Sequence, residues 1–451
     1  MVNAQKLPNE IAARQITRRA ALRCVGAIAA GSMLGVRRTW GQSPSDVLRV
    51  ASVGVGGQGW ADLNAVAADP RVRIVALCDV DSNALNNAAK AFGLAKTFRD
   101  YRRMFDALDQ EIDAVIVSTP DHMHGAVALA AMSLGKHVYV QKPLAHNLAE
   151  LRRMGDLAAE QGVVTQMGTQ IHGDQAYRTA ARALRDGVIG KVREAHLHVG
   201  RNWSGPDVRP ASAPPPANLD WDLWLGVAAD RPYAPEVYHP QTWRGWRDFG
   251  TGSLGDMGCH LFDPIFTGLG LAAPVKVVSH GPQHGGETFA NNGDVTFTFA
   301  GTPLTAEEVT CRWTDGDARR AVEKAQLPPG KELPGGGSFI VGERGVMVLP
   351  HWAMPTFFHD GQPMEVDVQP QGAVDHYQEW TRACRGDGKT STPFSYAGPV
   401  TESVLLGTIA GNFPDRPLRW NSAELKFDHA AATELVHRSY RQGWHIPQLT
   451  R

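Results

Sequence analysis

Lys142, Asp256 and His260 are the side chains of this sequence best suited to move a proton. Asp256 and His260 are four positions apart, so in a helix they would lie on one face. An imidazole is a natural base for an alcohol proton at neutral pH, and a carboxylate beside it can orient it. Lys142 could share the negative charge that develops on the alcohol oxygen. The three residues together predict chemistry at a hydroxyl group.

These positions also allow other interpretations. Asp256 and His260 could be a metal pair, or His260 a core histidine, but no third ligand at metal spacing is evident nearby, so we prefer a site with no metal. His122 and His124 could also suggest a metal, although at a strand end they fit packing and substrate contacts better. Lys142 could be an ordinary solvated lysine of a loop.

A glycine-rich segment would position this chemistry. The apolar run Leu48–Val55 has the β-branched content of a buried parallel strand and leads into Gly54-x-Gly56-x-x-Gly59. Gly54 would allow a tight turn, Gly56 the approach of a pyrophosphate, and Gly59 the packing of a helix on the strand. Asp79 ends a second apolar run, where a carboxylate can accept the ribose hydroxyls and repel a 2′-phosphate. This order of elements predicts a dinucleotide site that prefers NAD over NADP.

Strands continue to alternate with helices as far as residue 168. Buried strands are predicted at Asp113–Ser118 and His137–Val140, and they are followed by the polar clusters TPDHMH and QKP. The alternation predicts a doubly wound parallel sheet, in which loops at the carboxyl ends of the strands face the cofactor. The residues expected beside the cofactor are Gly54, Gly56, Gly57, Gln58, Gly59, Asp79, Thr119, Pro120, His124 and Lys142.

The second half of the sequence has a different character. Short β-like runs separated by Gly and Pro turns extend from Val275 to about Val368 and predict an antiparallel sheet. Gly335–Ser338 could be mistaken for a phosphate loop, but no P-loop lysine follows it, so we predict a hairpin turn. Two later segments, Asp375–Arg385 and Tyr396–Asn412, are predicted to be helices that pack on the sheet.

The composition excludes several classes of protein. A chain of 451 residues is too long for one compact core, so two domains are expected. A net charge of −1 gives no reason to expect nucleic acid or an anionic membrane as a partner. No run approaches the roughly 18 apolar residues of a transmembrane helix, so no membrane anchor is expected. The cysteines, at positions 24, 78, 259, 311 and 384, show no metal or disulfide spacing and are predicted to be thiols.

The first residues have the pattern of a leader. The charged stretch Thr17–Arg23 precedes the uncharged, Ala- and Gly-rich stretch Cys24–Val36. This pattern resembles a twin-arginine export signal, whose pathway carries folded proteins, so a periplasmic or otherwise exported protein is expected. No clean cleavage site is present, and we place the mature start at about Ser43. The predicted organisation is a signal peptide at 1–43, a dinucleotide-binding domain at 44–168, and a C-terminal substrate and oligomerisation domain at 169–451.

Five motifs combine in this sequence: Gly54-x-Gly56-x-x-Gly59, Thr119-Pro120 with His124, Gly135-Lys136-His137-Val138, Lys142-Pro143, and Gly255-Asp256 with His260. Together they resemble the glucose–fructose oxidoreductase / inositol dehydrogenase (Gfo/Idh/MocA) family over nearly everything after the leader. The resemblance implies an N-terminal Rossmann domain and a C-terminal α+β domain with a large, mainly antiparallel sheet. It implies Lys142, Asp256 and His260 as the catalytic residues, acting on a secondary hydroxyl of a sugar or cyclitol. We also expect a homo-oligomer, either a dimer or a tetramer.

One position departs from the family pattern. The family usually has Glu-Lys-Pro where this chain has Gln141-Lys142-Pro143. The change removes a carboxylate beside Lys142, an influence that would favour the charged lysine. Catalysis by Lys142 is not excluded by it.

We therefore expect an exported, NAD-dependent oxidoreductase with a tightly bound cofactor, acting on a secondary hydroxyl of a sugar, sugar derivative or cyclitol. Trp243, Arg244 and Trp246 could form a sugar platform, because aromatic faces pack on the apolar face of a sugar ring. A tryptophan core is the equally weighted alternative. A glycosidase or lyase that oxidises the sugar only transiently is the alternative function, and a dinucleotide-bound sugar sensor without catalysis is a third.

Overall fold

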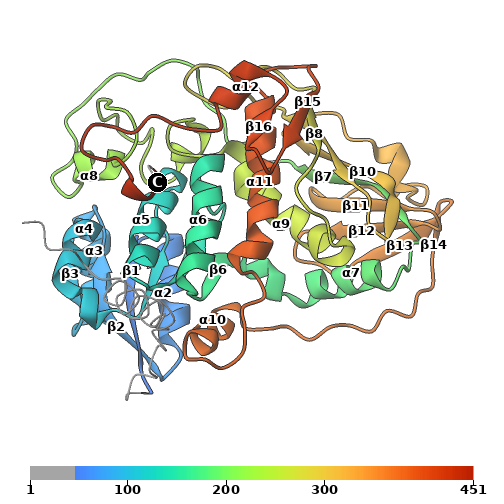
Figure 1. Cartoon of the computed structure of the whole chain (residues 1–451). Coiled ribbons are helices and arrows are strands. Elements are labelled where there is room, and N and C mark those ends of the chain that lie inside the picture. Colours follow the sequence, from blue (N-terminus) through green and yellow to red (C-terminus); the bar gives the residue numbers. More distant parts are fainter. Residues whose placement is uncertain (1–45, 450–451) are drawn as a thin grey trace, which may run out of the picture. The chain divides into compact units, whose positions relative to one another are not determined.

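The computed structural model describes residues 46–449, and the predicted signal peptide lies outside the described residues. From Val47 onward the chain forms one compact unit that contains two sheets. Figure 1 shows the six-stranded sheet with its helices on the left, in blue and teal, and the ten-stranded sheet on the right.

The first sheet is parallel and has the strand order β3-β2-β1-β4-β5-β6. This is the doubly wound order predicted from the sequence, and the strand order reverses between β1 and β4. The loops that follow these two strands therefore open a crevice at the carboxyl edge of the sheet. The strands are β1 (Leu48–Val53), β2 (Val72–Cys78), β3 (Lys96–Phe98), β4 (Ala114–Val117), β5 (His137–Gln141) and β6 (Thr165–Gly168).

Side-chain caps explain where several helices of this half begin. Asp81, Asp100 and Asn147 each accept an N–H bond from the first turn of the helix that follows. The prediction of a TPDHMH loop is partly wrong, because α5 already begins at Asp121, whose charge suits a helix N-terminus. The helices are α2 (Gln58–Ala67), α3 (Ser82–Ala91), α4 (Tyr101–Leu108), α5 (Asp121–Ser133) and α6 (Leu148–Gln161).

The second sheet has the order β14-β13-β12-β11-β7-β10-β9-β8-β15-β16, and all its pairs are antiparallel except β7 with β10. The predicted hairpin turn at Gly335–Ser338 is wrong. Most of this segment belongs to a strand, since β11 begins at Gly336 and its backbone pairs with β7 on one side and with β12 on the other. The strands are β7 (Val192–Val199), β8 (Lys276–Ser279), β9 (Asp294–Ala300), β10 (Thr305–Asp315), β11 (Gly336–Gly342), β12 (Val346–Pro350), β13 (Thr356–His359), β14 (Gln362–Pro363), β15 (Leu418–Asn421) and β16 (Lys426–Phe427).

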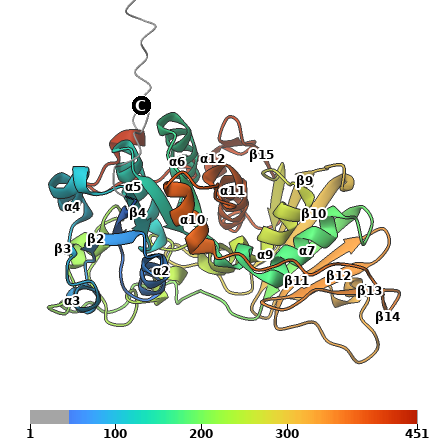
Figure 2. The same cartoon turned by 90° about the horizontal axis from the view of Figure 1, so that it is seen from below.

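Helices connect the two halves. α9 contacts α7 and α11, and α11 also contacts α6 of the first half. α10 lies against α2 (Figure 2), not on the second sheet. Its Trp380 is fully buried in a hydrophobic cluster with residues of the first sheet. The remaining helices are α7 (Gln175–Arg185), α8 (Trp221–Leu225), α9 (Gly252–Leu269), α10 (His376–Cys384), α11 (Phe394–Ala410) and α12 (Ala430–Glu434).

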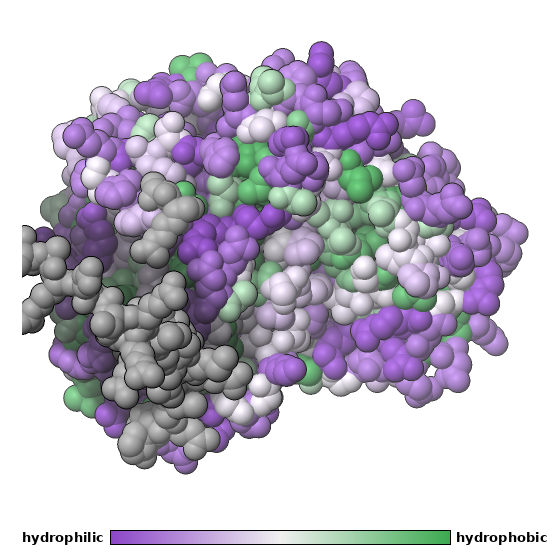
Figure 3. Space-filling model, viewed as in Figure 1, coloured by the Kyte–Doolittle hydropathy of each residue, from purple (hydrophilic) through white to green (hydrophobic). Residues whose placement is uncertain are grey.

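Hydrophilic residues cover much of the face seen in Figure 3 where it is not drawn in grey. Among residues 46–449, no helix combines the length and the apolar character needed to cross a membrane.

Candidate active site

A cleft of about 770 Å³ extends from the glycine-rich turn after β1 to α9 and the ends of β7 and β12. Its walls therefore come from elements of both sheets. Of the residues predicted for the site, Gly59 and Trp246 do not line the cleft. Those that line it are Gly54, Gly56, Gly57, Gln58, Asp79, Thr119, Pro120, His124, Lys142, Trp243, Arg244, Asp256 and His260.

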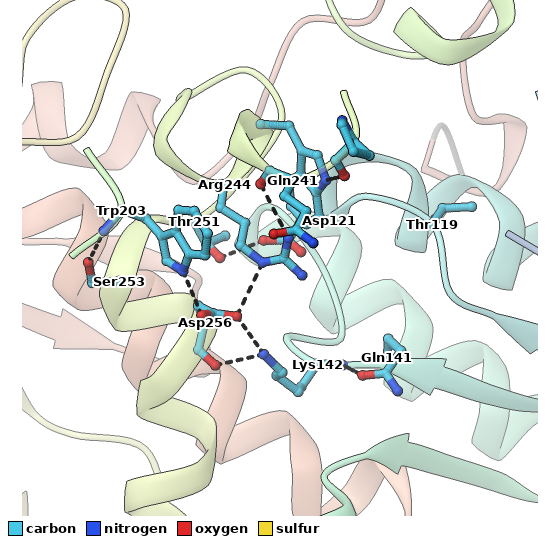
Figure 4. Close-up of polar contacts among 12 residues, drawn as sticks. Thr119, Asp121, Gln141, Lys142, Trp203, Gln241, Arg244, Thr251, Ser253 and Asp256 are labelled. Carbon is cyan, nitrogen blue, oxygen red and sulfur yellow. Dashed lines mark hydrogen bonds and ion pairs between the residues drawn. The ribbon is translucent and has the colours of Figure 1, made fainter. Parts of the chain in front are cut away.

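Lys142 and Asp256, 114 positions apart, form an ion pair in this cleft. The Lys142 Nζ lies 2.8 Å from the Asp256 Oδ1 and 2.7 Å from the Asp256 backbone oxygen. Arg244 Nε also donates to Oδ1, at 3.3 Å, and Trp203 Nε1 donates to Oδ2, at 2.7 Å (Figure 4). Burial opposes ionisation, but the charges of Lys142 and Arg244 hold the pKa of Asp256 well below its ordinary value. The carboxylate stays ionised and fixes the direction of the Lys142 ammonium.

His260 lies one helical turn after Asp256, on the predicted common face of α9. Asp256 bonds to Lys142, Arg244 and Trp203 and not to His260, whose buried Nδ1 has no hydrogen-bond partner within the described residues. Burial and the charge of Lys142 hold the pKa of His260 well below 6.5, with Asp256 opposing. The imidazole is therefore neutral at neutral pH and can accept a proton.

The departure at Gln141 has a structural explanation. The Gln141 amide donates to both oxygens of Asp62, at 3.0 and 2.8 Å, and Asp62 is fully buried on α2. Ser118, Gln58, Gln170 and Tyr377 donate further hydrogen bonds to the same carboxylate. None of these donors is a cation. A carboxylate thus occurs beside residue 141 after all, but it belongs to Asp62, and Gln141 is the neutral donor that it needs.

Exchanging this amide for a carboxylate should destabilise the protein. Gln141→Glu would place two buried carboxylates in contact and remove a donor, so we expect a loss of about 1–3 kcal/mol in unfolding free energy at neutral pH. Urea unfolding followed by circular dichroism measures it. The double variant Asp62→Asn/Gln141→Glu should recover most of the loss, because it restores one donor and one acceptor. A double variant as unstable as Gln141→Glu would contradict this assignment.

The residues around the glycine-rich turn fit a dinucleotide. A Cβ on Gly54 would lie 2.5 Å from the Ser118 carbonyl oxygen, and one on Gly59 would lie 2.1 Å from the Gly54 carbonyl oxygen. Only glycine permits this packing of turn on helix. The N-terminus of α2 has no side-chain cap and no acidic residue in its first turn, so its N–H groups suit a pyrophosphate. The buried Thr119 hydroxyl, in the cleft wall, has no partner among residues 46–449 and is free for a ligand.

Asp79 stands where the sequence predicts it, at the end of β2. Its carboxylate accepts the N–H groups of Val55 and Asp81, at 2.8 and 2.9 Å. Burial raises the pKa of Asp79, and these two hydrogen bonds oppose the shift. Asp81 and Arg99 line the same part of the cleft and were not predicted. Asp81 adds a second acid, while Arg99 adds a cation, so the two act in opposite directions on a 2′-phosphate.

The two histidines of α5 hydrogen-bond to backbone carbonyl oxygens around the site. His122 is fully buried, bonds to the Trp224 carbonyl oxygen at 3.1 Å, and has a pKa lowered by burial to about 3. His124 lies between the carbonyl oxygens of Thr119, at 2.8 Å, and Pro143, at 2.7 Å, and so connects the loops after β4 and β5. In the described part of the chain, no group of three or more His, Cys, Asp or Glu side chains is arranged to hold a metal ion.

The two predicted tryptophans, Trp243 and Trp246, belong to the same hydrophobic cluster, but only Trp243 also lines the cleft. Trp246 is 4% exposed and packs on Tyr238. Trp243 lines the cleft beneath the Arg244 guanidinium, which lies 4.4 Å from its ring centre. Trp203 and Trp352 also line the cleft and were not predicted as site residues. Trp203 could have been predicted, because it follows the strand β7, which is recognisable in the sequence. Trp352 could not, because it reaches the site only through the pairing of β11 with β7 and β12.

Two family models match the chain. One is described as an oxidoreductase family with an NAD-binding Rossmann fold and matches residues 48–169, and the other as the C-terminal alpha/beta domain of an oxidoreductase family and matches residues 192–305. Together they span more than half of the 451 residues.

Known proteins resemble parts of the chain. A levoglucosan dehydrogenase from Pseudarthrobacter phenanthrenivorans is 27% identical over 225 residues, 48% of this chain and 50% of the relative. A scyllo-inositol 2-dehydrogenase (NAD(+)) from Bacillus subtilis is 32% identical over 145 residues, 32% of this chain and 42% of the relative. The chain thus spans half or less of these curated relatives. The fold resembles the WlbA dehydrogenase from Bordetella pertussis, solved with NADH and UDP-GlcNAcA, with a TM-score of 0.59 and 18% identity, over 83% of this chain and 99% of that one.

Proposed function

Because the chain belongs to the Gfo/Idh/MocA oxidoreductase family, we propose that it oxidises a secondary hydroxyl of a sugar, sugar derivative or cyclitol with NAD. The observation that carries the proposal is that one cleft is lined both by the uncapped start of α2 and by Lys142, Asp256 and His260. The names of the two dehydrogenase relatives support the substrate class.

Each of the three residues has a distinct task in this proposal. His260, neutral because burial lowers its pKa, takes the proton of the substrate hydroxyl. Lys142 shares the negative charge that develops on the same oxygen, and Asp256 holds the ammonium in position. When bound, the nicotinamide accepts the hydride from the carbon that bears this hydroxyl. The Asp79 and Asp81 carboxylates support NAD over NADP, because both would repel a 2′-phosphate, whereas the opposing Arg99 guanidinium already donates to the backbone oxygens of Val80 and Asn218.

The leader suggests how the cofactor is used. We propose export by the twin-arginine pathway with the dinucleotide already bound, and a homo-oligomeric enzyme. Outside the cytoplasm no pool of free NAD is maintained, so the site must keep its cofactor through many turnovers. The hydride then passes to a second carbonyl substrate or returns to the first, and the net reaction is redox-neutral.

Purification without added cofactor tests these proposals. NAD should remain bound to the protein during gel filtration. Mass spectrometry after denaturation of the protein should identify the released cofactor. Given a second carbonyl compound as the hydride acceptor, the protein should then oxidise its sugar after dialysis with no added NAD. Recovery of NADP would contradict the proposed cofactor. Activity that disappears on dialysis and returns at micromolar NAD would contradict the proposal that the enzyme retains and regenerates its bound cofactor. Oxidised product identifies the oxidoreductase, whereas release of an aglycone without oxidised product would identify a glycosidase instead.

A further inference from the structure

Trp352 combines two unfavourable features at the wall of the cleft. It lies on the turn between β12 and β13, lines the cleft, and is 58% exposed. Its backbone φ of 64° lies in the left-handed region, which bulky residues rarely occupy because the Cβ approaches a carbonyl oxygen. An exposed indole on a strained backbone is not explained by packing, and outliers of this kind gather at ligand sites.

The position of Trp352 relative to His260 shows which part of a ligand it would contact. The ring of His351 contacts both, since it lies 5.9 Å from the His260 ring centre and 5.6 Å from that of Trp352. The Tyr177 hydroxyl is 2.8 Å from His351 Nδ1 and fixes this ring. Trp352 is therefore one ring beyond the residue that faces the reacting hydroxyl. It would contact a group attached to the reacting sugar, not the reacting carbon.

A second residue of the cleft adds polar recognition. Arg201 follows β7, lines the cleft, and lies with its guanidinium 5.6 Å from the ring centre of Trp203. Arg201 is exposed, so the donors of its guanidinium are available to ligand hydroxyls. An indole face together with a guanidinium suits a ring that has one apolar face and polar edges.

We propose that Trp352 and Arg201 form a second subsite that binds the ring attached to the oxidised sugar, so that the substrate is a glycoside and not a free monosaccharide. This inference rests on the proposed function for the identity of the first ring. The shared chemistry is a ring with an apolar face, which a second sugar or an aromatic aglycone both provide.

Binding without turnover tests the subsite. Titration calorimetry of the NAD-loaded Lys142→Met protein would compare glucose, cellobiose and phenyl β-glucoside, and then the same three ligand types built on galactose and mannose. Trp352→Asn should lower the preference for glycosides over the monosaccharide about tenfold. Asn tolerates the left-handed backbone, so the turn is kept. Met354→Ala, on the same turn, 42% exposed and outside the cleft, is the matched control and should change nothing.

The outcomes separate the subsite from the proposed function. Cellobiose and phenyl β-glucoside distinguish a second sugar from an aromatic aglycone. The subsite is overturned if no glycoside is preferred over its monosaccharide, or if Trp352→Asn weakens monosaccharide and glycoside equally. Glycoside binding that depends on Trp352 in a wild-type protein that never oxidises a sugar would instead contradict the proposed function and leave the subsite standing.

Discussion

Replacing Lys142 by methionine should slow hydride transfer by about 10²–10⁴-fold while the protein still binds its cofactor. Methionine keeps the length and the apolar part of the side chain but removes the ammonium that lies 2.8 Å from Asp256. Single-turnover kinetics with the NAD-loaded protein measure the step directly. The Lys142→Met/Asp256→Asn double variant should be little slower than Lys142→Met, because the two groups act as a unit.

Lys136 provides a closely matched control. It precedes the same strand, β5, and its Nζ contacts both the side chain of Asp109, at 2.8 Å, and the Asp109 backbone oxygen, at 2.6 Å. Lys136→Met therefore removes an equivalent ion pair at the opposite end of β5, outside the cleft. It should leave hydride transfer unchanged. Near-normal turnover of Lys142→Met would remove the lysine from the mechanism.

Replacing His260 by alanine should also slow hydride transfer by about 10²–10⁴-fold, and it should change the pH profile. Burial and Lys142 disfavour the imidazolium, so in the wild-type protein the active neutral form persists below pH 6.5, the ordinary pKa of histidine. The fall of kcat/KM on the acid side should therefore begin below pH 6.5. In His260→Ala this acid limb should disappear.

A histidine outside the cleft controls for nonspecific effects. Burial lowers the pKa of His284 to about 4, and this residue does not line the cleft. His284→Ala should keep both the rate and the acid limb. An acid limb that is unchanged in His260→Ala would assign the titration to another group, and His351 would be the next candidate because its ring contacts His260.

The sequence predicts what depends on local order. Strand, glycines, helix, second strand and Asp79 follow one another within about thirty residues, and each has a period or a residue type that identifies it. The helix spacing of Asp256 and His260 is equally local, and α9 places both in the cleft. α5 began earlier than expected because its polar residues find partners inside the fold, as Asp121 does with Thr251.

The remaining features depend on contacts between distant segments. Asp62 meets Gln141 across 79 positions, and neither residue indicates the other in the sequence. His351 and Trp352 reach the cleft because β11 pairs with both β7 and β12, and strand register in a ten-stranded sheet is set by packing and not by residue spacing. Trp246 and Trp243 are three positions apart, yet only Trp243 lines the cleft. The sequence alone does not show which side of a turn faces a cleft and which side is covered by the rest of the protein.

The most direct test of the central claim is to mix the NAD-loaded protein rapidly with a sugar or glycoside that it binds. The absorbance of reduced nicotinamide is then recorded over time. We predict a transient rise, at most stoichiometric with the bound cofactor, that becomes slower when deuterium replaces hydrogen on the ring carbons and nearly vanishes in Lys142→Met and His260→Ala. A sugar that binds in the cleft and is converted to product with no reduced nicotinamide at any time would contradict hydride transfer as the function of this site.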